Sequence, residues 1–170
     1  MAKAYTITSD PFYVNGSLTQ TAIDTYEELE ISMPLDSLNR EGVLVHAVYF
    51  TGSEPSATLN AISQIWTQVT STSKTGIVGA NDANTIARRE TLVYGGAAEF
   101  SGPHVIDMVG DSAPYSVSDN LAIVATDNVF LAINSVNQAA TKTVHFRMVC
   151  SRIKLSADAY AALVTNELSS

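Results

Sequence analysis

The segment Ser71–Glu90, STSKTGIVGANDANTIARRE, contains the small, polar and basic residues from which phosphate-binding loops are built. Such a loop needs the pattern G-x-x-x-x-G-K-[ST], in which the lysine directly follows the second glycine. Here Lys74 precedes Gly76, and Gly79 is followed by Ala80. Because the spacing is wrong, we expect no nucleotide to bind to this segment.

The same segment contains the start of a calcium-loop pattern. Asp82, Asn84 and Ile86 would take the first, third and fifth positions of that loop. The loop needs glycine at its sixth position and a carboxylate at its twelfth, where this chain has Ala87 and Val93. We therefore predict a flexible polar loop that binds neither nucleotide nor calcium.

A serine-protease triad is the next chemistry to consider, because His46, Asp107 and Ser112 follow one another in the order His, Asp, Ser. Pro114 stands two residues after Ser112 and has no N–H to donate to an oxyanion. His46 lies in an apolar run, where a hydrogen-bonded core or interface histidine is the commoner outcome. We predict that the protein has no catalytic residues and is not an enzyme.

The spacing of metal-ligand residue types also predicts no site. His46, His104 and His145 are scattered along the chain, and Cys150 is the single cysteine. Neither an internal disulfide nor a cysteine metal cluster can therefore form. A metal site assembled only in three dimensions stays open at this point. We predict no cofactor.

Three aromatic residues, Tyr49, Phe50 and Trp66, have the chemistry of a platform for a sugar ring. Large aromatic side chains more often contribute their area to a hydrophobic core. We therefore predict that these three residues fill a core.

The composition limits the kinds of partner that the surface can bind. Charged residues make up 15% of the 170 residues, against about 25% in an average soluble domain. Much of the surface must therefore be uncharged and polar, or covered by partners. The net charge is −8, and the nine Lys and Arg residues form no basic run. We expect no direct binding of nucleic acid, because phosphate contacts depend on clustered basic side chains.

The apolar runs are too short for a membrane-spanning helix. Val43–Phe50 is among the longest of them, whereas a spanning helix needs about 20 apolar residues. No apolar run typical of a secretory signal follows Met1. We expect a protein without a transmembrane segment that is made in the cytosol.

Period-two patterns dominate the chain and predict β-strands. Asn15-Gly16 between two extended runs predicts a hairpin turn, so residues 1–20 are expected to form an N-terminal arm or hairpin. Thr21–Ile31 reads as a strand that ends before Pro34. Leu35–Gly42 reads as a short helical turn.

Seven further segments between Val43 and Leu155 have strand character. Val43–Thr51 is apolar on both faces, as a strand buried on both sides would be. The others are Leu59–Thr70, Glu90–Phe100 with a bend at Gly95-Gly96, His104–Val109, Ala122–Ala125, Val129–Val136 and Lys142–Leu155. Residues 21–155 are therefore expected to form an all-β domain, an antiparallel β-sandwich or jelly roll of about eight strands.

Residues 156–170 predict a short C-terminal helix and tail. Ser156 is a good N-cap, and Leu155 and Tyr160 occupy the positions of a hydrophobic staple. The residues of the apolar stripe are Tyr160, Leu163, Val164 and Leu168. A helix this short needs to bury its stripe, either on its own sheet or on a neighbouring subunit. We favour the chain's own sheet.

The succession of strands from Thr21 to Leu155, followed by the closing strand and helix TVHFRMVCSRIKLSADAYAALVTNEL, resembles the single jelly-roll capsid proteins of small icosahedral viruses. The resemblance implies a self-assembling homo-oligomer in a virion, assembled in the host cytoplasm, with other virion proteins as further partners. The chain lacks the basic arm of plant-virus-like members, which leaves genome contact to another protein, a lining membrane or a packaging motor. A capsid decoration or fibre protein and a glycan-binding β-sandwich module are the alternative interpretations.

Overall fold

The computed structural model describes residues 4–79, 81–95, 100–108 and 121–168, which form ten β-strands, one 3₁₀ turn and one α-helix. The elements are β1 (Tyr5–Ile7), β2 (Phe12–Thr19), β3 (Glu27–Ser32), η1 (Ser37–Asn39), β4 (Glu41–Gly52), β5 (Ala61–Thr70), β6 (Thr85–Gly95), β7 (Phe100–Met108), β8 (Ala122–Val124), β9 (Asn128–Val136), β10 (Thr143–Leu155) and α1 (Ala157–Leu168). No helix of this described part is long and apolar enough to cross a membrane.

The strands pair in a nested order around the β5–β6 pair. β4 pairs with β8, β3 with β9 and β2 with β10, all antiparallel, as in one long ribbon folded back on itself. Two more pairings, β10 with β4 and β5 with β9, form when this ribbon wraps around. The result is the connectivity of a jelly roll, and the predicted antiparallel sandwich is confirmed.

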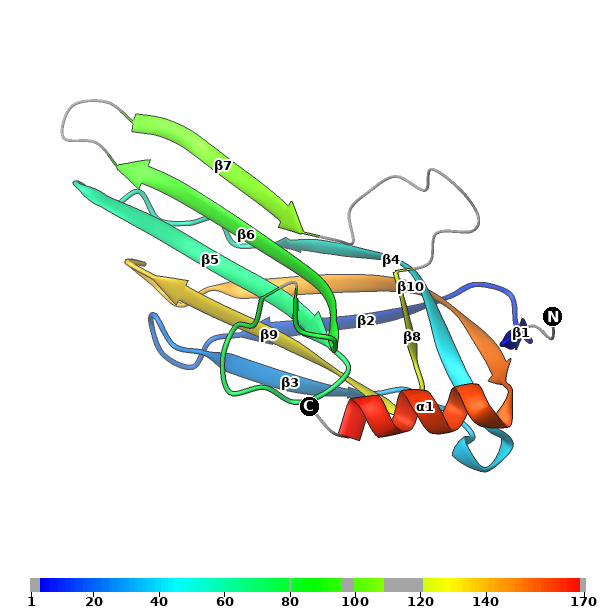
Figure 1. Cartoon of the computed structure of the whole chain (residues 1–170). Helices are drawn as coiled ribbons and strands as arrows, with labels where there is room; N and C mark the ends of the chain where they lie inside the picture. The colour runs from blue at the N-terminus through cyan, green and yellow to red at the C-terminus, as the bar shows by residue number, and fades with distance from the viewer. Residues whose placement is uncertain (1–3, 80, 96–99, 109–120, 169–170) are drawn as a thin grey trace.

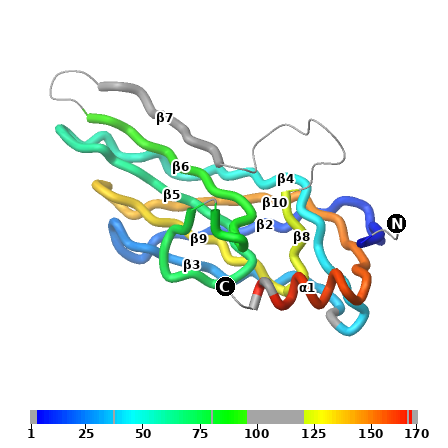
Figure 2. Tube along the Cα trace, in the orientation of Figure 1, coloured from blue at the N-terminus to red at the C-terminus, as the bar shows by residue number. Residues whose placement is uncertain are grey.

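Wrapping divides the strands between two sheets (Figures 1 and 2). Sheet A has the order β2-β10-β4-β8, and sheet B has the order β3-β9-β5-β6. β1 and β7 are additions to this pattern. β1 pairs with the end of β10, and β7 pairs with β6 at the edge of sheet B.

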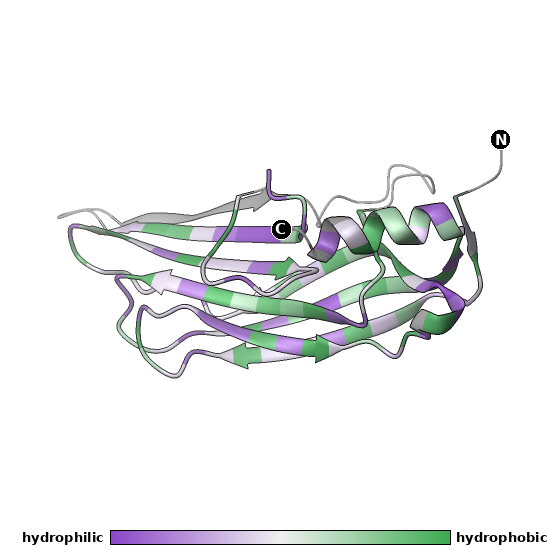
Figure 3. Cartoon of the chain, turned by 60° about the horizontal axis from the view of Figure 1, so that its bottom comes forward, coloured by the Kyte–Doolittle hydropathy of each residue, from purple (hydrophilic) through white to green (hydrophobic). Residues whose placement is uncertain are grey.

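Hydrophobic and hydrophilic residues are interspersed along the strands (Figure 3), and hydrophobic residues of the two sheets meet in one core. Val48, Met148 and Leu131 are fully buried there. β4 contributes to two clusters, because Val43 and Val45 point into this core while Leu44 belongs to a second cluster beside α1. The first half of β4 is therefore buried on both faces, as its apolar run predicts.

α1 lies on its own chain. Its N-cap is Ser156, whose Oγ accepts a hydrogen bond from the Ala159 N–H at 3.3 Å. Tyr160, Leu163 and Val164 pack against a buried cluster of Leu44, Ala125, Ile153 and Leu155. The side chain of Leu168 lies outside the described residues, and a role of the stripe in assembly stays a prediction.

The predicted hairpin at Asn15-Gly16 is wrong. β2 runs through both residues, and Gly16 pairs with Phe146 on β10. A Cβ on Gly16 would lie 2.6 Å from the Phe146 ring and 2.7 Å from Ile31. Glycine is required here because two core side chains approach the backbone closely, and not because the chain turns.

Three other boundaries differ from the sequence prediction. β3 begins at Glu27 because a turn with Asp24 at positive φ precedes it. β6 begins at Thr85, inside the segment expected to be loop. β6 ends at Gly95 and β7 begins at Phe100, so the predicted strand Glu90–Phe100 belongs to two strands. A Cβ added to Gly95 would clash with the Thr58 carbonyl. Gly96 and the predicted turn at 110–114 lie outside the described residues.

Candidate functional site

Among the residues of the possible triad, the side chain of His46 is described. His46 Nε2 lies 2.9 Å from Ser151 Oγ on the neighbouring strand β10, within hydrogen-bond distance. His46 is thus a hydrogen-bonded histidine, as its place in an apolar run predicts. Asp107 lies on β7, of whose side chains nothing is described, and Ser112 lies outside the described residues. Of the three residues, His46 is therefore the one whose side chain lies in the described part of the chain.

No group of three His, Cys, Asp or Glu side chains converges within the described part of the chain. His145 lies on the outer face of sheet A, and the side chain of His104 is not described. Cys150 is fully buried, and burial raises the pKa of its thiol to about 12. That thiol therefore stays protonated at neutral pH.

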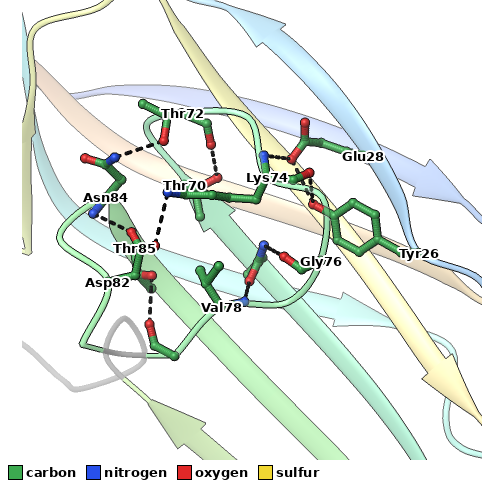
Figure 4. A network of polar contacts seen from close by, with 12 residues as sticks. Tyr26, Glu28, Thr70, Thr72, Lys74, Gly76, Val78, Asp82, Asn84 and Thr85 are labelled. Atoms are coloured by element: carbon green, nitrogen blue, oxygen red, sulfur yellow. Dashed lines mark hydrogen bonds and ion pairs between the residues drawn. The ribbon is translucent and has the colours of Figure 1, made fainter. Parts of the chain in front are cut away.

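The polar segment 71–84 is held onto the outer face of sheet B (Figure 4). Glu28 on β3 accepts hydrogen bonds from the Lys74 N–H at 2.9 Å and from the Tyr26 hydroxyl at 2.8 Å. Burial, together with Glu28, raises the pKa of the Tyr26 phenol well above its usual range. The phenol therefore remains a hydrogen-bond donor to the carboxylate.

Two further contacts fix the rest of this segment. Gln68 is fully buried beneath it, accepting from the Val78 N–H at 2.9 Å and donating to the Gly76 carbonyl at 3.2 Å. Lys74 and Asp82 form an ion pair at 3.1 Å. The expected flexible loop is thus an ordered cover for sheet B, and its polar residues bond to each other and to the sheet.

An open hollow with a volume of about 810 Å³ lies on the outer face of sheet A. Three strands place their outward side chains in three rows across this groove. The rows, taken as β2-β10-β4, are Tyr13-Val149-Ala47, Asn15-Arg147-Tyr49 and Ser17-His145-Thr51. The alternate residues Val144, Phe146, Met148 and Val48 point into the core. These opposite orientations follow from the period of two along a strand.

Arg147 stands at the centre of the groove in a fixed orientation. Its Nε donates to Asn15 Oδ1 at 3.1 Å, and its guanidinium carbon lies 5.2 Å from the centre of the Tyr13 ring. This distance is within the range of a cation–π contact. The hydrogen bond to Asn15 uses Nε and not the two terminal NH₂ groups of Arg147.

The groove presents aromatic surface to solvent on both sides of this arginine. Tyr13 is 63% exposed and Tyr49 is 46% exposed. Phe50, in contrast, packs against the core. The prediction that Tyr49 fills the core is therefore wrong. Successive residues of a strand point to opposite faces, and this alternation is the sequence signal that separates the outward Tyr49 from the inward Phe50.

A second hollow of about 310 Å³ opens between the two sheets. Thr67 and Arg89 line it, and Arg89 donates to the Phe50 carbonyl at 2.7 Å. The arginine thus bridges sheet B to sheet A. The Arg89 hydrogen bond beside this hollow holds the two sheets together, and the groove on sheet A is the better candidate for recognition.

No protein-family model matches the sequence, and no curated protein matches it. Among solved structures, the chain is similar to a tailspike protein, gp49 of the Acinetobacter baumannii bacteriophage Fri1, a capsular polysaccharide depolymerase. The two share 13% identity with a TM-score of 0.21, over 76% of this chain and 21% of the tailspike chain. The chain thus spans about a fifth of the length of that protein, and a similarity at this level assigns neither a fold nor a function.

Proposed function

We propose that the chain is a self-assembling structural subunit of a virus particle, with a place in the capsid shell as its first role. The jelly-roll connectivity supports this proposal, because virus shells use this architecture repeatedly. In this role the protein acts in the virion through contacts with further copies and with other virion proteins. It is a building block and carries out no catalysis.

The observation that carries the proposal is an exposed apolar patch at one end of sheet B. Ile62 on β5 and Tyr94 on β6 are directly paired across the two strands, and they are 46% and 50% exposed. Leu59, just before β5, is 69% exposed. Neighbouring apolar side chains in solvent are typical of a surface that a partner covers.

The described terminal elements pack away from Ile62 and Leu59, the two aliphatic residues of this patch. β1 pairs with β10 and α1 packs on the cluster around Leu155, so both terminal elements make intramolecular contacts. The segment 71–84 covers Gln68, at the other end of β5. A second copy of the subunit is therefore the occupant that we propose for the patch.

The test is to place a charge in the patch. Ile62→Glu should abolish assembly and leave the melting temperature of the isolated subunit within about 1–2 °C of the parent, because surface changes shift stability by at most about 0.5 kcal/mol. Leu38→Glu, at an exposed leucine in η1, is the matched control and should assemble normally. Light scattering and negative-stain imaging measure the assemblies.

Ile62→Glu subunits that assemble like the parent would contradict the proposed interface. The size of the parent assembly separates the two virion roles. Closed shells support the capsid role, whereas rings or trimers that bind to preformed particles support a decoration or fibre role. A parent protein that stays monomeric at all concentrations would contradict assembly altogether.

A further inference from the structure

The groove on sheet A combines a cation without a carboxylate in its lining and two exposed tyrosines. Its lining contains Arg147 and His145 but no Asp or Glu, although the chain has 17 acidic and nine basic residues. Three other cations, Lys74, Arg88 and Arg152, lie within 4.0 Å of a carboxylate. Within the described residues Arg147 has no such partner. The groove is therefore a local site for an anionic group.

The second feature is the pair of tyrosines beside this cation. An exposed tyrosine ring offers a flat face for the C–H groups of a pyranose, and its hydroxyl remains available for a polar contact. Tyr49 lies directly across the strands from Arg147, and Tyr13 lies beneath the guanidinium. A ligand that contacts the arginine must therefore also lie against an aromatic face.

The remaining lining residues add hydrogen-bond donors and acceptors. Ser17, His145 and Thr51 form one row across the three strands, and their side chains can donate to and accept from sugar hydroxyls. We infer that this groove binds an acidic saccharide, in which a carboxylate pairs with Arg147 and the sugar ring lies against Tyr49 or Tyr13. A planar guanidinium suits a carboxylate because two parallel N–H···O bonds can form.

The orientation of Arg147 is already set before a ligand arrives. Its Nε is held by Asn15 and its plane is held against Tyr13, so little side-chain freedom remains to be lost on binding. The rows lie on three adjacent strands of one sheet, and the spacing between the groups is therefore fixed by the register. This rigidity suits repeated units of a polymer better than a flexible surface would.

The experiment compares two sugars that differ only in the carboxylate. The probes are an oligosaccharide that contains glucuronic acid and the same oligosaccharide after reduction of its carboxyl groups. Titration calorimetry and saturation-transfer NMR should show saturable binding of the acidic probe and at least tenfold weaker binding of the reduced one. Sodium sulfate at matched ionic strength should not displace the acidic probe more than sodium chloride does.

Two variants locate the site, and a third is the control. Arg147→Gln and Tyr49→Ala should each weaken binding of the acidic probe at least tenfold without changing the melting temperature, since both side chains are exposed. Lys154→Gln removes the same charge from an exposed position on β10 outside the groove and should weaken binding less than twofold.

Four results would overturn the inference. They are no binding of the acidic probe to the parent, equal binding of the reduced probe, equal loss of binding in Lys154→Gln and Arg147→Gln, and displacement by sulfate alone. Loss of self-association in Arg147→Gln, with no saccharide bound by the parent, would instead assign the groove to a contact between subunits. Because the assembly test uses Ile62, the two proposals can fail independently.

Discussion

Glu167 is a buried carboxylic acid at the end of α1, and its removal tests how the helix is docked. The side chain is 4% exposed. Its Oε1 accepts a hydrogen bond from the Ala125 N–H at 3.1 Å, whereas Oε2 has no hydrogen-bond partner among the described residues. Burial raises the pKa of this carboxyl above its ordinary value of 4.5, and the Ala125 amide, together with the side chain and amide of Thr126, offsets only part of that effect.

Glu167→Gln should therefore stabilise the protein at neutral pH. The folded chain holds the proton of Glu167 more tightly than the unfolded chain does. The contribution of Glu167 to the free energy of unfolding is therefore highest below pH 4.5 and falls as the pH rises through the folded pKa. A buried polar group without a partner costs about 1–3 kcal/mol. Each kcal/mol moves the melting temperature of a chain of this size by about 2–4 °C.

Scanning calorimetry between pH 4 and pH 8 measures this effect. The difference between Glu167→Gln and the parent should be small at pH 4 and should grow to several degrees at pH 8. Glu54→Gln removes the same charge from an exposed position and should show no such growth. A difference that is constant with pH, or a Glu167→Gln protein that melts earlier at pH 8, would refute the reasoning.

Two other substitutions test the elements that cover the sheets. Leu163→Ala should lower the melting temperature of the isolated subunit, because the side chain is half-buried against the cluster of Ile153 and Leu155, and the loss should be about 1–3 kcal/mol. Normal melting combined with weaker assembly would contradict intramolecular docking. Glu28→Ala should release the segment 71–84, since its carboxylate accepts hydrogen bonds from two groups there, the Ser73 hydroxyl and the Lys74 N–H, at a cost of about 1–3 kcal/mol. Limited proteolysis measures the release, and unchanged cleavage within 71–84 would contradict it.

The elements of this fold could be predicted from the sequence where local pattern and tertiary packing agree. The signals for β10 and for the start of α1 are local. A period of two predicts the strand, and an N-cap serine predicts the start of the helix. Asn15-Gly16 shows where they disagree. Its local signal is that of a turn, but the closeness of Phe146, which is more than a hundred residues away in the chain, decides the conformation.

The candidate site could not be predicted from the sequence, because it depends on strand register. Tyr13, Tyr49 and Arg147 come from three separate segments, and each alone has the pattern of an ordinary half-exposed strand. Only the pairing of β2 and β4 on either side of β10 places them together. The ordered cover over sheet B has the same cause, because Glu28 and Lys74 lie in segments that meet only in the folded chain.

The residues of the stability predictions and the residue of the assembly test lie at opposite ends of the sandwich, so the two kinds of prediction can be tested separately. At one end α1 and the segment 71–84 cover the structure, and Leu163, Glu167 and Asn84 line one small hollow of about 70 Å³ between them. At the other end, on the left in Figure 1, β5 begins and β6 ends, and there Ile62 and Tyr94 are exposed. The stability predictions therefore concern contacts at the covered end, whereas the assembly proposal concerns an exposed side chain at the other end. Substitutions at Glu167 or Leu163 should change melting with little effect on binding, and substitutions at Ile62 should change association with little effect on melting.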